Sequence, residues 1–348
     1  MNGLSENGEL AYKELATIIK HRSQKILERF ERAIISNVTD SKLLEIMTDV
    51  INYWSSSKST SRDLIRPALT SFSCEAVGGD PEVADDAGLM FTIASAGFGI
   101  HDDILDRSLR KHMRPTILGL HGIDGALLSG DLLLVKGWSV LGEIILKSRN
   151  PAKIAEIINE YASCSIEICE AELMETRCRR NLERDLDYSC SILWKAMAEA
   201  EACCKIGAIM GEGNIDEIKA LAQFGRRLGF TYRLIDEIQD CLNLKGDLAH
   251  RLEYESVPIP LLYAAKSSAD KCRRIKKIIE KANICPSEIQ TLLAVCFETE
   301  AFEYIRKMAQ ENSRQAAKYL SAVRASDARK VLLLLNERAY TRITEMCV

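Results

Sequence analysis

Two short acidic patches, each embedded in apolar sequence that favours a helix, constrain this chain more than any other feature. The first lies in 100–106 and the second in 234–240, and neither interval contains Gly or Pro. Both carry acids at positions i, i+1 and i+4, a spacing that places them side by side on a helix. The acids are Asp102, Asp103, Asp106, Asp236, Glu237 and Asp240.

Three carboxylates on one helical patch repel each other unless they face water or hold a hard cation. Mg²⁺ takes oxygen ligands, keeps several waters and binds substrate phosphates through one or two carboxylates. A solvated helix face is the alternative for either patch alone. The hydrophobic pattern of the flanking segments, 98–105 and 228–238, indicates that they are buried. This favours the interpretation that the two patches face a cavity and hold a metal–phosphate cluster between them.

The rest of the chain predicts an all-α fold. Seven prolines occur, several at expected helix starts, the apolar spacing is helical, and alternating strand patterns are absent. The expected helices are 9–36, 41–56, 61–77, 81–107, 119–147, 151–180, 185–211, 214–244, 256–266, 269–282, 286–312 and 314–342. No linker interrupts them, so we expect a single all-helical domain over 1–348, with the acids on the fourth and eighth helices.

Composition excludes several classes of protein. At 47% apolar and 28% charged residues with a net charge of −4, the chain has no basic field for nucleic acid. No run approaches 18 uninterrupted apolar residues, and 1–28 has no apolar core of signal-peptide type, so we expect a cytoplasmic protein without a membrane span. The 12 cysteines include no CxxC pair, so we expect no zinc site. We expect the cysteines to be free thiols.

Several cations are candidates for binding a polyphosphate. The segment 107–116 follows the first patch and contains Lys111 and His112; its alternative role is to balance the nearby acids. Arg66 lies at an expected helix start. Lys195 stands alone in an apolar helical segment, where it either extends to the surface or binds a phosphate.

These residues together resemble the trans-isoprenyl diphosphate synthase, or polyprenyl synthetase, family. The likeness runs from about Arg62 to Ala265. Its matching pieces are 66–67, 78–81, 101–106, 115–116, 130–133, Tyr188 with Lys195, 207–208, 236–240 and 257–261. Paired acid motifs at this separation are its most specific part.

The resemblance implies an orthogonal multi-helix bundle around a central cavity, usually dimeric. It implies three Mg²⁺ ions between the acid motifs and an allylic diphosphate, with Asp102, Asp103, Asp106 and Lys195 catalytic. Arg66, Lys111 and His112 would bind substrate, alongside Lys195. Residues a turn before the first patch would line the cavity, and Phe98 is the bulky candidate for its floor.

The chain also departs from the family. Asp63 stands where the family has lysine, Ser95 where it has histidine, and Lys111-His112 where it has two arginines. Tyr232-Arg233 replaces Phe-Gln, and the later Lys-x-Thr is missing around Glu255-Ser256. The metal side is therefore intact, while the side for isopentenyl diphosphate has lost cations, which predicts a high KM for that substrate.

The leading hypothesis is a Mg²⁺-dependent trans-prenyltransferase that extends an allylic diphosphate with isopentenyl diphosphate to a polyprenyl diphosphate. One alternative is a terpene synthase-like enzyme that ionises and quenches the allylic diphosphate alone. Asp240 and Leu244 argue against it, because a terpene-synthase motif has a hydroxyl residue and Glu there. The other alternative is a partner subunit of a heteromeric prenyl diphosphate synthase; otherwise a homodimer is expected.

Overall fold

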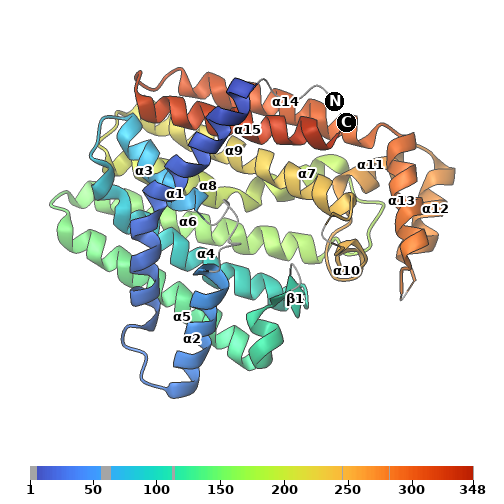
Figure 1. The fold of residues 1–348 in the computed structure, drawn as a ribbon, viewed down its shortest axis with the longest axis horizontal. Helices are drawn as coiled ribbons and strands as arrows, with labels where there is room; N and C mark the ends of the chain where they lie inside the picture. The colour runs from blue at the N-terminus through green and yellow to red at the C-terminus, as the bar shows by residue number, and fades with distance from the viewer. Residues whose placement is uncertain (1–5, 56–63, 112–113, 245, 282, 348) are drawn as a thin grey trace. The chain divides into compact units, whose positions relative to one another are not determined.

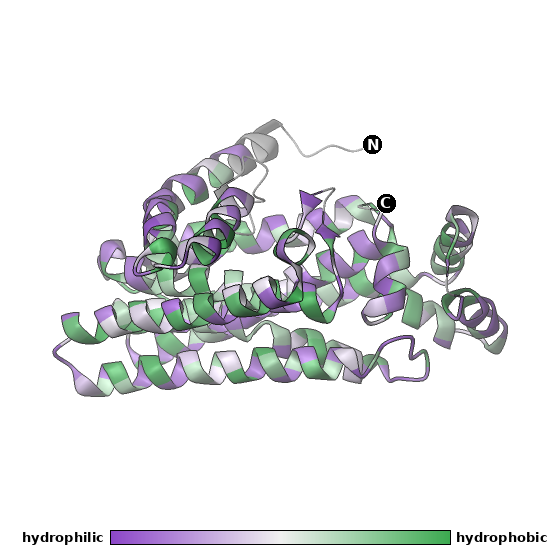
Figure 2. Cartoon of the chain, turned by 90° about the horizontal axis from the view of Figure 1, so that it is seen from below, coloured by the Kyte–Doolittle hydropathy of each residue, from purple (hydrophilic) through white to green (hydrophobic). Residues whose placement is uncertain are grey.

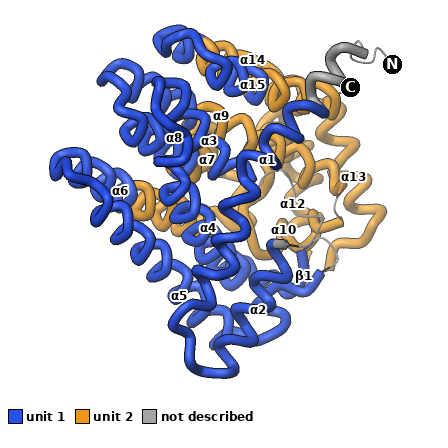
Figure 3. The backbone as a smooth tube through the Cα atoms, turned by 60° about the vertical axis from the view of Figure 1, so that its left-hand side comes forward, with its two compact units in different colours: residues 1–163, 199–225, 318–335 blue, residues 164–198, 226–317, 336–348 orange. Residues whose placement is uncertain are grey.

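The structure is a computed structural model that describes residues 6–55, 64–111, 114–244, 246–281 and 283–347 (Figure 1). Almost all regular structure within these ranges is helical. Hydrophobic and hydrophilic residues alternate along the helices, as amphipathic packing elements require (Figure 2). The chain divides into two compact units, which are coloured separately in Figure 3. That 1–348 is a single domain stays a prediction, which a single cooperative unfolding transition would support.

Unit 1 comprises 1–163, 199–225 and 318–335. Its elements, or the parts that fall in it, are α1 (Glu6–Ile35), α2 (Ser41–Ser55), α3 (Ile65–Ala76), η1 (Pro81–Ala84), α4 (Asp85–Leu105), β1 (Arg110–Lys111), β2 (Arg114–Pro115), α5 (Ile117–Lys147), α6 (Pro151–Thr176), α8 (Ala198–Met210), α9 (Ile215–Cys241) and α15 (Asp327–Met346). Helices α6 and α9 end in unit 2, as does α15.

Unit 2 comprises 164–198, 226–317 and 336–348. Besides the remaining parts of α6, α9 and α15, its elements are α7 (Leu186–Ala196), α10 (Leu248–Tyr254), α11 (Ile259–Lys266), α12 (Ala269–Ile279), α13 (Pro286–Glu298) and α14 (Ala301–Leu320). Helix α11 is apolar and packs against α7, α12 and α13, so it forms the centre of this unit.

Helix α4 is the core helix of unit 1. It is buried from Asp86 to Gly97 and packs against α1, α3 and α5. A helix that is apolar on all sides must be covered by others. The stretch Pro81–Leu105 is long and apolar enough to cross a membrane, but 78% of its most apolar window is buried, as expected of a core helix.

Helix α5 is equally apolar but only 33% buried over its most apolar window. It carries a row of exposed hydrophobic residues: Leu120, Ile123, Leu127, Leu128, Val135, Trp138, Ile145 and Leu146. Gly122 interrupts the helix with φ +70°, a conformation that glycine adopts without steric cost. With two helices of this composition, the expected absence of a membrane span stays a prediction, as does the cytoplasmic location.

Three predicted helix starts are confirmed. The Asp80 side chain accepts from the Glu82 amide ahead of η1, α6 begins at Pro151 and α13 at Pro286. Other boundaries were wrong. The expected helix 185–211 is broken at Met197, α10 was not expected, and the expected break near 313 lies at 321–326 instead.

One short antiparallel pairing departs from the expectation of no sheet. Arg110 lies opposite Pro115, and Lys111 lies opposite Arg114. This two-residue ladder holds the segment after the first acidic patch and so orients Lys111.

Candidate active site

The first acidic patch lies at the C-terminal end of α4, in unit 1. Asp102 and Asp103 occupy its last turn and Asp106 is the C-cap residue. The Asp103 side chain is only 10% exposed, whereas that of Asp102 is 36% exposed. Acids are disfavoured at a helix C-terminus, where the helix dipole is negative. A nearby cation would therefore stabilise the three acids at this end of the helix.

Lys111 supplies part of that compensation. Its Nζ donates to Asp102 Oδ2 and lies beside Asp103 Oδ1, both at 2.8 Å. Burial raises the pKa of Asp103 to about 6, and the charge of Lys111 opposes that rise. Burial lowers the pKa of Lys111, but the charges of Asp102 and Asp103 outweigh it and hold that pKa well above its ordinary value. Lys111 therefore contacts the acids from which metal ligands were predicted.

A cavity of about 140 Å³ opens beside these acids within unit 1. Its lining comes from α2, α4, β1 and α5: Val50, Tyr53, Trp54, Ala96, Gly99, Ile100, Asp102, Asp103, Lys111 and Ile117. The walls are mainly apolar and one end is charged, which suits a hydrocarbon chain that carries an anionic head. Phe98 is not among the lining residues, and its role as cavity floor stays a prediction.

A larger cavity of about 710 Å³ lies at the N-terminal end of α4. Its charged residues are mostly paired with each other; Arg29 and Lys147, for example, both contact Asp86. It contains none of the predicted site residues. The small cavity beside Asp102 is therefore the better candidate for substrate chemistry.

The second acidic patch lies near the C-terminal end of α9, in unit 2. Glu237 is 1% exposed, and both of its carboxylate oxygens have protein partners. Arg251 of α10 donates to Oε1, and the Ile259 amide donates to Oε2 over 2.6 Å. Arg251 also donates to Asp240 Oδ2 over 2.5 Å. Burial lowers the pKa of Arg251, but Glu237 and Asp240 hold it well above its ordinary value, so this internal cation neutralises much of the patch.

Lys195 lies in the last turn of α7, where a cation complements the helix dipole. Its Nζ contacts Glu170 of α6, and its side chain is 30% exposed. Nearby, Arg226 donates to Glu167 and to the carbonyl of Trp194. Lys195 is therefore paired within unit 2, and phosphate binding by it stays a prediction.

Arg66 lies in the first turn of α3 and donates through Nε to Glu199 Oε2 over 2.5 Å, within unit 1. Two other sequence candidates, Asp63 and His112, lie outside the described residues. The structure thus groups Asp102 and Asp103 with Lys111 in unit 1, and Glu237 and Asp240 in unit 2. The roles predicted for the site residues stay predictions.

Sequence reasoning missed the partners of these residues: Arg251, Glu199, Glu170 and Glu175. Glu175 accepts from Ser256 over 2.7 Å and lies 3.6 Å from Arg233. One signal was available, because the family's Lys-x-Thr is missing around Glu255-Ser256. Arg251, four residues before Glu255, is the nearby cation, and it contacts Glu237 and Asp240.

Solved structures share the fold. A geranylgeranyl pyrophosphate synthetase from Pyrococcus horikoshii superposes with a TM-score of 0.82 at 23% identity, covering 95% of this chain and 99% of its own. A decaprenyl diphosphate synthase from Rhodobacter capsulatus gives 0.81 at 20% identity, with the same coverage. The all-α, isoprenoid synthase-like fold class is confirmed.

The chain belongs to the polyprenyl synthetase family, whose model matches residues 44–296. The short chain isoprenyl diphosphate synthase of Methanothermobacter thermautotrophicus is 27% identical over 331 residues, which cover 92% of this chain and 97% of that protein. The geranylgeranyl diphosphate synthase of Methanosarcina mazei is 26% identical over 177 residues, covering 51% of this chain and 54% of its own. The family resemblance seen in the acid motifs is confirmed.

Proposed function

We propose that this protein is a trans-prenyltransferase that joins an allylic diphosphate to isopentenyl diphosphate and releases inorganic diphosphate. The observation that carries the proposal is the patch of Asp102 and Asp103 at the charged end of an apolar cavity. A relative that matches 92% of this chain and is named a short chain isoprenyl diphosphate synthase supports the same reaction. The overall product is a longer polyprenyl diphosphate.

The carboxylates fit magnesium. Asp103 is buried beside Asp102, and burial together with this neighbouring charge raises its pKa, which a bound cation would lower. Asp102, Asp103, Asp106, Asp236, Glu237 and Asp240 are the oxygen ligands we assign to three Mg²⁺ ions per site. When bound, these ions would withdraw charge from the diphosphate as it departs.

The side chains act by position and charge. The allylic C–O bond breaks, its electron pair leaves with the diphosphate, and Lys195 and Lys111 stabilise that growing charge. The apolar walls around Trp54 and Ile100 hold the hydrocarbon chain and exclude water from the allylic cation. The double bond of isopentenyl diphosphate then forms the new C–C bond, and one proton is lost to the released diphosphate. Arg66 and His112 are assigned to isopentenyl diphosphate.

A homodimer is part of this proposal. The exposed hydrophobic row on α5, from Leu120 to Leu146, is the kind of surface that proteins cover in assemblies. Light scattering during size-exclusion chromatography should give twice the chain mass. A monomer would leave the hydrophobic row of α5 uncovered, and the homodimer would then be rejected. If the chain dimerised only with a homologous chain, the heteromeric alternative would be favoured.

The deciding experiment measures products. The purified protein is incubated with Mg²⁺ and allylic diphosphates of several lengths, with and without isopentenyl diphosphate. We expect longer diphosphates only when isopentenyl diphosphate is present. Hydrocarbon or alcohol products without it would instead establish the terpene synthase-like alternative.

Matched variants test the acids. Asp102→Ala and Asp236→Ala should each abolish turnover, whereas Asp216→Ala, an exposed acid at the start of α9, should retain it. Near wild-type turnover in Asp102→Ala or Asp236→Ala, with Mg²⁺ present, would reject the metal role. Circular dichroism should show that each variant remains folded.

A further inference from the structure

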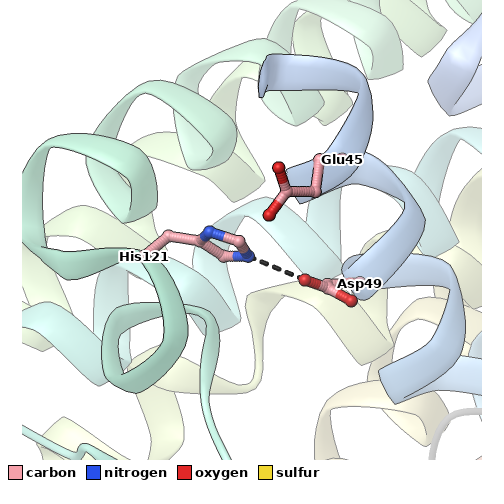
Figure 4. A group of neighbouring side chains, drawn as sticks. All are labelled: Glu45, Asp49 and His121. Carbon is pink, nitrogen blue, oxygen red and sulfur yellow. Dashed lines mark hydrogen bonds and ion pairs between the residues drawn. The ribbon is translucent and has the colours of Figure 1, made fainter. Parts of the chain in front are cut away.

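Three metal-ligating side chains converge in unit 1 away from both acidic patches. Glu45 and Asp49 lie one turn apart on α2, and His121 reaches them from α5 (Figure 4). One ligand atom from each residue lies within 4.8 Å of the other two. Among the described residues, this is the only set of three or more His, Cys, Asp or Glu side chains that meets this distance.

The position of His121 is built into the local backbone. Gly122, the next residue, has φ +70° and interrupts α5 there. A Cβ on Gly125 would lie 2.8 Å from the Cβ of His121, so the missing side chain makes room for the histidine. The His121 side chain is 6% exposed and lies with Nε2 2.8 Å from Asp49 Oδ2. The ring is therefore more than nine-tenths buried and is aimed at the two carboxylates.

The carboxylates exceed what a simple ion pair needs. One acid, Asp49, is enough to partner His121, yet Glu45 lies on the same side one turn earlier. The Glu45 carboxylate contacts Lys42 over 2.7 Å, but both side chains are more than half exposed and such a pair contributes little. Glu45 can therefore turn to a cation held by the other two at small cost.

The ligand types identify the class of cation. One imidazole nitrogen with two carboxylates suits a borderline divalent ion such as Zn²⁺, with water completing its coordination. Mg²⁺ instead prefers an all-oxygen set. The absence of CxxC pairs does not bear on this set, because it contains no cysteine.

We propose that Glu45, Asp49 and His121 form a binding site for a zinc-class divalent ion that clamps α2 to α5. The site is separate from the magnesium ligands and does not depend on the proposed function. Its consequence concerns the small cavity, whose walls include Val50 and Trp54 of α2 and Ile117 of α5. An ion that joins these two helices holds that wall in place.

The test uses the full-length, untagged protein in excess Mg²⁺, which occupies all-oxygen sites. Calorimetric titration with Zn²⁺ should show one ion per chain, and Co²⁺ should give a visible absorption spectrum characteristic of nitrogen ligation. Zn²⁺ should also raise the midpoint of thermal unfolding, since ligands of the native state stabilise it. Absence of binding in the wild type overturns the proposal.

Variants locate the ion. His121→Ala should abolish the Co²⁺ spectrum, and Glu45→Gln, at an exposed position, should weaken Zn²⁺ binding by about tenfold or more, as losing even an outer partner of a metal site does. His21→Ala removes an exposed histidine of the same unit and should change nothing. Asp102→Ala should also leave the spectrum intact. The assignment would be overturned if the Co²⁺ spectrum persisted in His121→Ala or disappeared in Asp102→Ala. It would also be overturned if Glu45→Gln bound Zn²⁺ with unchanged affinity.

Discussion

Glu199 accepts a hydrogen bond from Arg66 over 2.5 Å, and both side chains are largely buried, at 14% and 26% exposure. Arg66 matches a family residue and is a cation that this chain keeps among those expected to bind isopentenyl diphosphate. Its guanidinium is thus already engaged by a carboxylate of its own unit. A diphosphate that binds Arg66 must compete with Glu199, which adds to the cost of replacing the family lysine by Asp63.

Glu199→Gln should therefore lower the KM for isopentenyl diphosphate. A charge-assisted hydrogen bond contributes about 1.5–3 kcal/mol, so release of Arg66 should lower KM by about tenfold or more. Steady-state kinetics at saturating allylic diphosphate measures the change. Glu156→Gln, an exposed acid of α6 in the same unit, serves as the control and should leave KM unaltered. An unchanged KM in Glu199→Gln would show that Arg66 does not bind this substrate.

Asp103 should make the metal-free protein less stable as pH rises. Burial raises its folded-state pKa to about 6, above the unfolded value of about 3.9, so the folded state binds more protons between these values. Stability from this group is full below pH 4 and is lost by about pH 6, an effect on the order of 2–3 kcal/mol. Urea unfolding in EDTA measures the free energy of unfolding at pH 4.5 and at pH 7. Between these two pH values, Asp103→Asn should lose less of this free energy than the wild type; equal losses would contradict the assignment.

Lys195→Ala should raise the KM for the allylic diphosphate and lower kcat, because its contact strengthens as the leaving group gains charge. Glu170→Gln should have the opposite effect, because it neutralises the carboxylate that Lys195 contacts in the free protein. That variant should lower the allylic KM. If Lys195→Ala alters only thermal stability, the lysine is structural.

Product length should depend on α2 as well as on α4. Trp54 lines the cavity beside Asp102, whereas Phe98 lies outside its lining. Trp54→Leu, which keeps an apolar side chain, should lengthen products more than Phe98→Ala does. Mass spectrometry of the diphosphates compares the two. Longer products from Phe98→Ala alone would restore Phe98 as the floor.

The helices were predictable where their ends carry local chemistry. Asp80-Pro81 and Cys285-Pro286 marked starts because capping and the proline ring act within a few residues. The break after α13 carried no such mark. It passes through Glu300, whose φ of +55° is a left-handed conformation usually left to glycine, so neither glycine nor proline signalled it. Gly122 was visible in the sequence, but a glycine inside an apolar helical pattern does not by itself show that the residue adopts φ +70° and interrupts α5.

The acid motifs were predictable because their spacing is a property of one helix. The cations that meet them are not, since Arg251 comes from a separate helix that had no expected counterpart. Lys111 was named as a phosphate ligand from its place after the first patch. Its contact with Asp102 and Asp103 depends on the β1–β2 pairing. That pairing has only two residues on each strand, too few to give a recognisable strand pattern in the sequence.

The Lys111 bridge gives metal binding a second effect. If Asp102 and Asp103 hold an ion as proposed, the ammonium group of Lys111 would leave their oxygens and become available to a bound phosphate. Binding of magnesium and of diphosphate would then be linked thermodynamically, and each would strengthen the other by the same factor. Because Lys111 occupies the predicted ligands in the free protein, we expect magnesium and diphosphate to bind together rather than independently.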